Sequence, residues 1–204
     1  MKLLIFGGGD LAAAIEKSAL MILHDVVVVE HKDVDAGVYE DVLQVVEFEM
    51  PDYIVCTAGT SDVASDNLGE VLNDNLVTAI NVGTAAGIYD VPCVLVASTA
   101  GISPGTHLWY GPAKAGVINF VRAAANRGSR IWAVSPGRMD TKMRDADFPD
   151  EDPATRLRPQ KVAHLIIDVL DGDYAPGANV VIRKVGLHRV DVYEEAAPTL
   201  PSLL

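Results

Sequence analysis

Tyr110 and Lys114 are the two residues in this sequence whose types and spacing best suit proton transfer. Side chains four residues apart lie on one face of a helix, one turn above the other. A free phenol has a pKa of about 10, and an ammonium group beside it favours the phenolate. Such a tyrosine can exchange a proton with a substrate oxygen. The same spacing is common on solvated helix surfaces, so its meaning depends on the elements around it.

Short apolar runs alternate with helical patterns along the chain. The expected strands are residues 3–6, 25–30, 53–56, 92–98, 130–134 and 180–182, and the expected helices are residues 11–23, 39–49, 65–89, 110–126 and 159–171. This alternation predicts a doubly wound parallel sheet with helices on both faces, a Rossmann-like α/β fold. We expect a single domain over residues 1–204, of which residues 185–204 form a C-terminal tail without a clear element. Residues 30–51 leave little room for a full helix plus strand, so we expect a shortened or missing crossover there.

Three glycines follow the first expected strand. Gly7, Gly9 and Ala12 fit the spacing G-x-G-x-x-[G/A] between a strand and a helix start, which is typical of a dinucleotide-binding turn. Glycines there let the backbone approach a pyrophosphate, and the alanine lets the helix pack closely on the strand. The alternative is a tight turn that binds no ligand.

Four charged or titratable side chains bear on the choice of cofactor. Glu30 ends the second expected strand, where a carboxylate accepts hydrogen bonds from the ribose 2′-hydroxyl of NAD. Asp10 would repel the 2′-phosphate of NADP, whereas His31 and Lys32 would attract it. We therefore expect NAD(H) to be favoured, with NADP(H) as the second possibility.

Residues suited to ligand binding follow the carboxyl ends of five expected strands. They are the Gly7 turn, Glu30, Ala58-Gly59, Ser98 and Pro136-Gly137. In doubly wound sheets, ligands bind in the crevice beyond these ends. The sequence therefore predicts one site along a single edge of the sheet.

The composition limits the class of partner. Half of the 204 residues are hydrophobic, and 16 Lys and Arg against 28 Asp and Glu give a net charge of −12. An acidic surface argues against nucleic acid and against anionic membranes, because both need clustered cations. No apolar run approaches the ~18 residues that span a bilayer. A small molecule is the expected partner.

The two cysteines, Cys56 and Cys93, both lie in expected strands and are interpreted as buried thiols. Neither a disulfide framework nor a metal site is supported by so few. Residues 3–6 could open a signal peptide, but Asp10 and the glycines before it interrupt the apolar stretch. The cytoplasm is the expected setting.

Over roughly residues 1–185 the sequence resembles the short-chain dehydrogenase/reductase family. Ser98, in Ser-Thr-Ala-Gly, stands twelve residues before Tyr110 and matches the catalytic serine, while Tyr110 and Lys114 match Y-x-x-x-K. Asn75 matches the helix asparagine of the catalytic tetrad. Two further segments are similar to family motifs: Ala58-Gly59 to the end of N-N-A-G, and residues 135–141 to the P-G-x-x-x-T segment that wraps the nicotinamide.

The resemblance implies hydride transfer between a nicotinamide and a small carbonyl or alcohol substrate. Tyr110 would be the general acid, Lys114 would assist it and hold the nicotinamide ribose, Ser98 would bind the substrate oxygen, and Asn75 would hold the water path that re-protonates Lys114. The expected cofactor contacts are Gly7, Gly9, Asp10, Leu11, Glu30, Asp33, Ala58, Gly59, Tyr110, Lys114, Pro136, Gly137, Met139 and Thr141.

The glycine turn departs from the family pattern T-G-x-x-x-G-x-G. Phe6 stands for the threonine, and Leu11 and Ala13 stand for the later glycines. We expect cofactor binding to persist through the G-x-G-x-x-A spacing.

Two alternatives to this enzyme remain open at the level of sequence. One is a non-catalytic dinucleotide-binding sensor or scaffold, and the other is an epimerase-like enzyme acting on a nucleotide-sugar, for which the chain is short. The irregular residues 138–156 are either a lid over the substrate or a plain surface excursion. By analogy with the family, the helices at residues 65–89 and 110–126 would form contacts of a homodimer or homotetramer.

Overall fold

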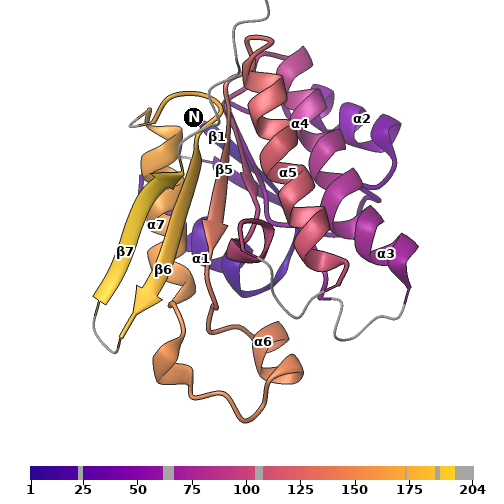
Figure 1. Ribbon diagram of the computed structural model, residues 1–204. Helices are drawn as coiled ribbons and strands as arrows, with labels where there is room; N and C mark the ends of the chain where they lie inside the picture. The colour runs from indigo at the N-terminus through magenta and orange to yellow at the C-terminus, as the bar shows by residue number, and fades with distance from the viewer. Residues whose placement is uncertain (23–24, 62–66, 104–107, 173, 187–188, 196–204) are drawn as a thin grey trace, which may run out of the picture.

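The computed structural model describes residues 1–22, 25–61, 67–103, 108–172, 174–186 and 189–195. Within them, seven strands form one sheet in the order β2-β1-β3-β4-β5-β6-β7 (Figure 1). Their bounds are β1 Lys2–Phe6, β2 Asp25–Val29, β3 Tyr53–Cys56, β4 Cys93–Val96, β5 Ile131–Pro136, β6 Asn179–Val185 and β7 Arg189–Glu195. The first six strands are parallel, and β7 runs antiparallel to β6. The predicted Rossmann-like α/β fold is confirmed.

Helices cover both faces of the sheet, so that the chain forms three layers (Figure 1). On one face lie α1 Gly9–Ala19 and α7 Pro159–Leu170, and on the other lie α2 Tyr39–Glu49, α4 Thr78–Ile88 and α5 Tyr110–Ala125. Alternate strand residues supply the two cores, because successive side chains of a strand point to opposite faces. In β1, for example, Leu3 and Ile5 belong to the first core, and Leu4 and Phe6 to the second.

The expected shortening between residues 30 and 51 is present. One helix, α2, carries the chain from β2 to β3, which pairs with the far side of β1. In the most familiar doubly wound order a third strand flanks the second, whereas here β2 forms the edge of the described sheet. Its four valines are in consequence only partly buried, although their sequence is that of an interior strand.

Two helical predictions differ from the structure in their extent. The first helix ends at Ala19 rather than residue 23, and the apolar Leu20, Met21 and Ile22 after it are exposed. The expected helix over 65–89 is three consecutive segments: α3 Leu68–Leu72, a π-helical turn η1 Asn73–Val77, and α4. Its expected start lies outside the described residues.

The expected tail contains a strand that the sequence did not predict. β7 is an edge strand whose partly buried positions are acidic, Asp191 and Glu195, while its valines are exposed. Glu195 accepts hydrogen bonds from Arg122 of α5 (3.1 Å) and from Asn179 of β6 (2.8 Å). The hydrophobic pattern is therefore a poor signal for β7, which is held by paired polar groups.

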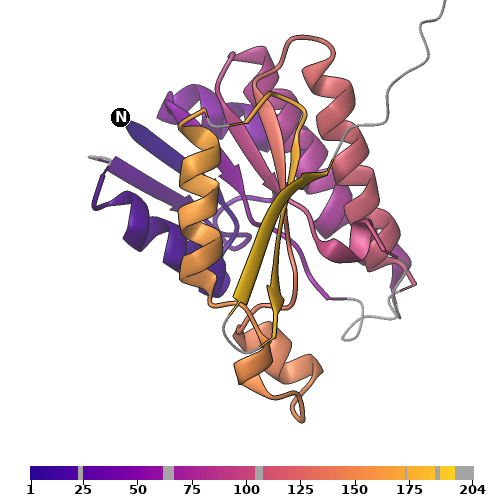
Figure 2. The same ribbon diagram turned by 60° about the vertical axis from the view of Figure 1, so that its left-hand side comes forward.

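Residues 138–157 form a lid segment that projects beyond the carboxyl ends of the strands (Figures 1 and 2). It contains α6 Lys142–Asp147 and the 3-10 turn η3 Pro153–Thr155. Two backbone bonds close its base: Leu157 N–H donates to the Arg138 carbonyl and Asp140 N–H to the Leu157 carbonyl, each at 2.8 Å. We use the name lid for these residues below.

Both cysteine side chains are buried and free, as the sequence predicted. Within the part of the chain that the structure describes, no helix is long and apolar enough to cross a membrane.

A close backbone approach fixes the Ser98 turn against α5. The short helical turn η2 Thr99–Gly101 packs on the first turns of α5, where Pro112 is tolerated. A Cβ atom at Gly101 would lie 2.7 Å from the Lys114 carbonyl carbon and 2.7 Å from the Ala115 nitrogen. Such contacts are too short for any side chain, so a glycine at 101 sets the distance between the serine turn and the helix that carries Tyr110.

We expect Gly101→Ala to lower the free energy of unfolding by about 1–3 kcal/mol, because the added methyl group must push two backbone segments apart. Urea denaturation would measure the change. Ser103→Ala, at an exposed position in the same loop, is the matched control and should leave stability unaltered. Equal stability of the two variants would contradict the close approach.

Candidate functional site

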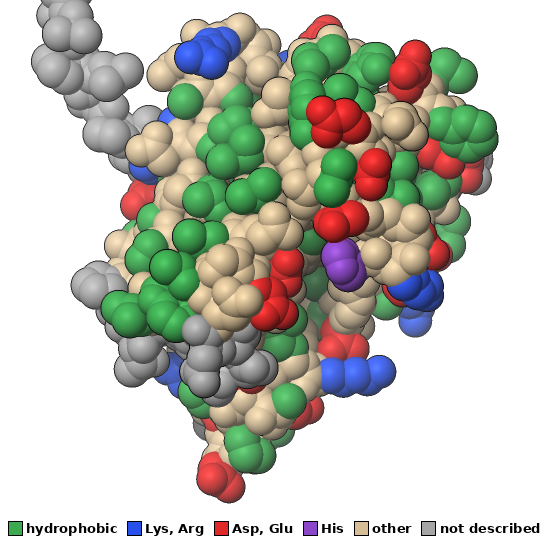
Figure 3. Space-filling view, turned by 90° about the vertical axis from the view of Figure 1, so that its right-hand side faces the viewer, with side chains coloured by type: hydrophobic (Ala, Val, Ile, Leu, Met, Phe, Trp, Pro, Cys, Tyr) green, Lys and Arg blue, Asp and Glu red, His purple; other side chains and the backbone are tan. Residues whose placement is uncertain are grey.

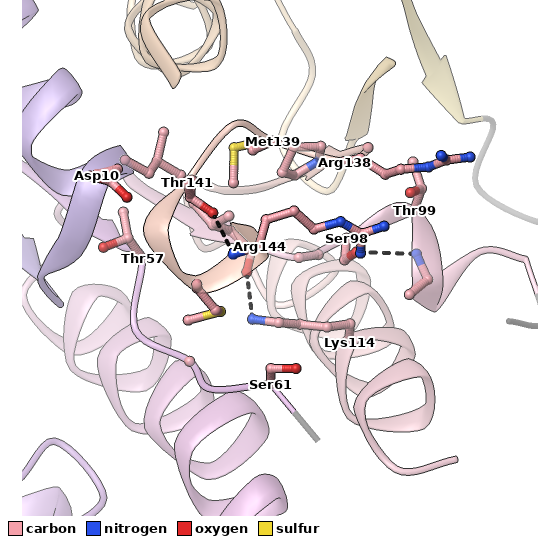
Figure 4. A pocket seen from close by; sticks show the side chains of 18 of the residues that line it. Asp10, Thr57, Ser61, Ser98, Thr99, Lys114, Arg138, Met139, Thr141 and Arg144 are labelled. Atoms are coloured by element: carbon pink, nitrogen blue, oxygen red, sulfur yellow. Dashed lines mark hydrogen bonds between the residues drawn. The ribbon is translucent and has the colours of Figure 1, made fainter. Parts of the chain in front are cut away.

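A cavity of about 1330 Å³ lies beyond the carboxyl ends of the strands, where the sequence placed the site (Figure 4). It brings together most of the predicted residues, from seven separate stretches of chain. Those lining it are Gly9, Asp10, Leu11, Glu30, Gly59, Asn75, Ser98, Tyr110, Lys114, Pro136, Gly137, Met139 and Thr141.

Three predicted residues do not line the cavity. Gly7 is buried at the joint between β1 and the glycine turn, where a Cβ would lie 2.6 Å from the Ala58 nitrogen. Gly7 and Ala58 therefore pack on each other behind the cavity wall. Asp33 faces away from it, and its carboxylate accepts the Glu30 N–H at 3.2 Å.

The Lys114 side chain is almost wholly buried, with 4% of its surface exposed. Its ammonium donates to the Val96 carbonyl at the end of β4 (3.1 Å, Figure 4) and lies 5.6 Å from the centre of the Tyr110 ring. Burial lowers the pKa of Lys114 from 10.5 to about 8, and a small opposing effect comes from Cys56. The group can therefore lose and regain a proton close to neutral pH.

Asn75 presents an unpaired oxygen beside Lys114. Its Nδ2 donates to the Thr60 and Val71 carbonyls, both at 2.9 Å, whereas its buried Oδ1 has no protein partner. A Cβ at Gly59 would lie 2.5 Å from Asn75 Oδ1 and 3.2 Å from Lys114 Nζ. A side chain at position 59 would therefore clash with the amide oxygen, so glycine lets Asn75 and Lys114 lie close against this turn.

The π-helical turn is what points Asn75 inward. Asn75 lies at the middle of η1 Asn73–Val77, inside the run that links α3 to α4. A π turn adds a residue to the helix and is often found at functional sites. The sequence gives a helical pattern through this region but no signal for the extra residue.

Ser98 and Tyr110 face the cavity from the ends of β4 and the start of α5. Ser98 is in extended conformation, and its Oγ accepts the Ala100 N–H at 3.2 Å. The hydroxyl still has its own proton to donate and a second lone pair. Tyr110 is the first residue of α5, so Lys114 lies one turn further into the helix, as the spacing predicts.

The glycine turn leads directly into α1. Gly9 adopts φ +83°, where other residues are strained, and no atom lies within 4 Å of the position its Cβ would take. Gly8, Gly9 and Asp10 thus leave the cavity open above the helix start. Ala12 is 1% exposed, which allows the close packing of α1 that the fingerprint requires. Asp10 accepts the Lys142 N–H of the lid at 2.7 Å.

Glu30 lines the far end of the cavity and is engaged by its neighbour. Lys32 Nζ lies 2.7 Å from Glu30 Oε2, and both side chains are substantially exposed. Glu30 favours NAD and Lys32 favours NADP in the sequence argument, but in the structure the two side chains form one surface ion pair. Such a pair contributes little to stability.

The lid contributes residues that the sequence did not identify. Arg138 and Arg144 line the cavity, and both donate to Glu151, at 2.8 Å from Arg138 and 2.7 and 2.9 Å from Arg144. The hydrogen bonds from Arg144 and then Arg138 lower the pKa of Glu151 to about 2. The available signal was an irregular segment with scattered arginines, which marks a loop without placing its side chains.

The hairpin of β6 and β7 supplies a second set of unpredicted residues. Arg183, Lys184 and Tyr193 line the cavity from this side. Because residues 185–204 were expected to form a tail, nothing in the sequence placed Tyr193 next to a site. In the described part of the chain, no cluster of three or more His, Cys, Asp and Glu side chains could hold a metal ion.

Comparisons with known proteins show the fold. No protein-family model matches the sequence, and no curated protein matches it. Among solved structures, the chain is similar to the 3-alpha-hydroxysteroid dehydrogenase of a Pseudomonas species in complex with NADH, with a TM-score of 0.76 and 20% identity over 89% of this chain and 94% of that one.

Two other solved structures give the same result. One is a short-chain glucose/ribitol dehydrogenase from Brucella melitensis, with a TM-score of 0.75 and 18% identity over 92% of this chain and 96% of that one. The other is a dTDP-4-dehydrorhamnose reductase from Clostridium acetobutylicum, with a TM-score of 0.74 and 16% identity over 91% of this chain and 75% of that one. The predicted resemblance to short-chain dehydrogenases/reductases is thus confirmed for the fold.

We expect Lys114→Met to raise the free energy of unfolding at pH 7. Below pH 8 both the folded and the unfolded chain carry the charge, and folding then includes the full cost of burying it. A pKa lowered from 10.5 to about 8 corresponds to about 3 kcal/mol. As the pH rises from 8 to 10.5, the lysine loses its proton in the folded chain before it does so in the unfolded chain. The free energy of unfolding of the wild type therefore rises relative to that of the variant.

Urea denaturation at pH 7 and pH 10 would measure this difference. Lys161→Met, on the exposed side of α7, is the control and should show no such pH dependence. A Lys114→Met variant that is less stable than the wild type by the same amount at both pH values would refute the buried-charge account.

Proposed function

We propose that the protein is an NAD(P)-dependent oxidoreductase that transfers hydride between a nicotinamide and a small carbonyl or alcohol substrate. One observation carries the proposal: Asn75, Ser98, Tyr110 and Lys114 converge in a cavity that also contains the glycine turn. Each residue alone has a plain structural explanation. Together they place a proton donor, a second oxygen ligand and a proton relay in one cavity of about 1330 Å³. The fold shared with dehydrogenases and reductases supports the same class of reaction.

The cavity suits a dinucleotide in both shape and donor groups. The turn at Gly8 and Gly9 leaves open space where a pyrophosphate can approach the start of α1. Glu30 lines the same cavity and would recognise a ribose hydroxyl of the cofactor. Tyr110 lines it together with Ser98 and Lys114. Pro136, Gly137 and the lid would enclose the nicotinamide portion.

When bound, the nicotinamide supplies or accepts the hydride. The residues of this chain would manage the proton. Tyr110 would donate its phenolic proton to the substrate oxygen during carbonyl reduction, and Ser98 would donate a hydrogen bond to the same oxygen. The ammonium of Lys114 would favour the phenolate that remains on Tyr110.

Lys114 would then release its proton to restore the Tyr110 phenol, and it would regain one from a water held by Asn75. A buried ammonium with a pKa of about 8 can release a proton near neutral pH. The unpaired Asn75 Oδ1 is the acceptor that would order a water next to it. This pairing gives Asn75 a role in positioning, because it acts through a water and Lys114 and does not touch the substrate.

We expect Tyr110→Phe to reduce turnover by roughly 10²–10⁴ because the proton donor is removed while the ring remains. NADH should bind within a few-fold of the wild type, as measured by its fluorescence. Tyr89→Phe, at the exposed end of α4, is the control and should retain full turnover. Unchanged turnover in Tyr110→Phe would favour the alternative of a dinucleotide-binding sensor.

We also expect NADH to bind more tightly than NADPH. Glu30 and Asp10 both oppose a 2′-phosphate, and the charge of Lys32 is engaged by Glu30. Glu30→Gln should therefore reduce the difference between the affinities for NADH and NADPH, because it removes one carboxylate and releases Lys32. Fluorescence titration with both cofactors would test this, and tighter binding of NADPH by the wild type would contradict it.

A further inference from the structure

The positive charge of this acidic protein gathers at one cavity. The chain has only 16 Lys and Arg against 28 Asp and Glu, and the face shown in Figure 3 carries more acidic than basic side chains. The cavity reverses this balance. Six of its lining residues are basic, and three are acidic: the basic ones are Lys114, Arg138, Lys142, Arg144, Arg183 and Lys184, and the acidic ones are Asp10, Glu30 and Asp147.

Two of the three cavity-lining carboxylates, Asp10 and Glu30, lie apart from the cations of Arg138 and β6. Asp10 and Glu30 come from the glycine turn and the end of β2. In Figure 4 Asp10 lies on one side of the pocket, while Ser98 and Thr99 lie on the other. The side chain of Arg138 extends toward Thr99 in this view. The cavity thus has two carboxylates where the cofactor ribose is expected, and Asp147 is the acidic residue among the cations on the side where the substrate is expected.

The lid carries six Asp and Glu against four Lys and Arg, but only one of these carboxylates bonds to its cavity-lining arginines. Glu151 is the carboxylate bonded to both Arg138 and Arg144, and it also accepts from Arg156 at 3.1 Å. Arg156 is paired in addition with Asp145. One carboxylate therefore serves two cavity-lining guanidinium groups. Arg138 uses a single nitrogen for its bond, and 62% of its side chain remains exposed, so several of its N–H donors are available.

The β6–β7 hairpin adds two more cations from the strand that lies next to the start of the lid. Arg183 lies over the Tyr193 ring, with its guanidinium carbon 5.3 Å from the ring centre. Lys184 donates to the Ala154 carbonyl of the lid, which is a neutral acceptor. Among the described residues, neither cation forms an ion pair with a carboxylate. Two cations from β6 and one from the lid therefore line the same part of the cavity.

We propose that the substrate carries an anionic group, a carboxylate or a phosphate, that is bound by Arg138 and Arg183. The inference rests on the proposed function, because it assigns the substrate end of that site. Arg138 presents a planar donor fork suited to either oxyanion. Arg183 lies beside Gly137, the residue before Arg138, and its guanidinium contacts the Tyr193 ring. Lys142 is left out of this subsite because its backbone lies against Asp10 of the glycine turn.

Matched charged and neutral carbonyl compounds test the proposal. The probes are 4-oxopentanoate against its methyl ester, and dihydroxyacetone phosphate against dihydroxyacetone. For each pair, calorimetric affinity and turnover would be measured with saturating NADH. We expect at least one anion to bind roughly 10- to 100-fold more tightly than its neutral counterpart, the gain typical of charge-assisted hydrogen bonds. The pair that shows the gain distinguishes a carboxylate from a phosphate.

Arg138→Gln and Arg183→Gln should each lower the ratio of the affinity for the anion to that for its neutral counterpart by about tenfold or more. They should leave the affinity for the neutral compound and for NADH within a few-fold. Arg127→Gln, at an exposed position outside the cavity, is the matched control. Raising the salt concentration should weaken binding of the anion and leave the neutral compound unaffected.

The outcomes separate this inference from the proposed function. If the protein binds NADH but holds both anions no more tightly than their neutral counterparts, the anionic substrate is refuted and the oxidoreductase stands. Equal effects of Arg138→Gln and Arg127→Gln on the charge preference would also refute the subsite. If neither NADH nor NADPH binds, the proposed function itself has failed.

Discussion

The buried ammonium of Lys114 is the interaction on which the site depends. A charge removed from water must be held by neighbouring polar groups or lose its proton. The Val96 carbonyl provides one acceptor at the end of β4, and the glycine at position 59 lets the Asn75 oxygen lie close by. The end of one strand, the turn after another and a π-helical turn must therefore meet at this point. Tyr110, one turn away on the same helix, is positioned by the same arrangement.

The order of strands and helices could be predicted because its signals are local. Buried parallel strands are continuous runs of branched apolar residues, such as Val94-Leu95-Val96 of β4, and they alternate with helices of regular period. β7 gave no such signal. Its inward groups are Asp191 and Glu195, and Glu195 is satisfied only by Arg122 and Asn179, which are remote in sequence. An edge strand held by distant polar partners has no hydrophobic pattern of its own.

Those parts of the candidate site in which backbone geometry dictates the residue type could be predicted. The parts formed by long side chains from distant segments could not. The Gly9 turn and the Tyr110–Lys114 pair follow from fixed spacings. Arg138, Arg144 and Arg183 reach the cavity only because the lid and the β6–β7 hairpin meet above the strands. The contact of Asp33 with the adenine stays a prediction. In the structure a turn at Glu30 directs its carboxylate back to the Glu30 N–H.

The lid connects the two ends of the cavity. Its shape is set from within, because the buried Arg156 is paired with Asp145 and Glu151 and also donates to the Phe148 carbonyl. Its position is set from outside by two contacts: the Lys142 N–H donates to Asp10 of the glycine turn, and Lys184 of β6 donates to the Ala154 carbonyl. These internal and external contacts together link the glycine turn to the β6–β7 hairpin through one segment of the chain.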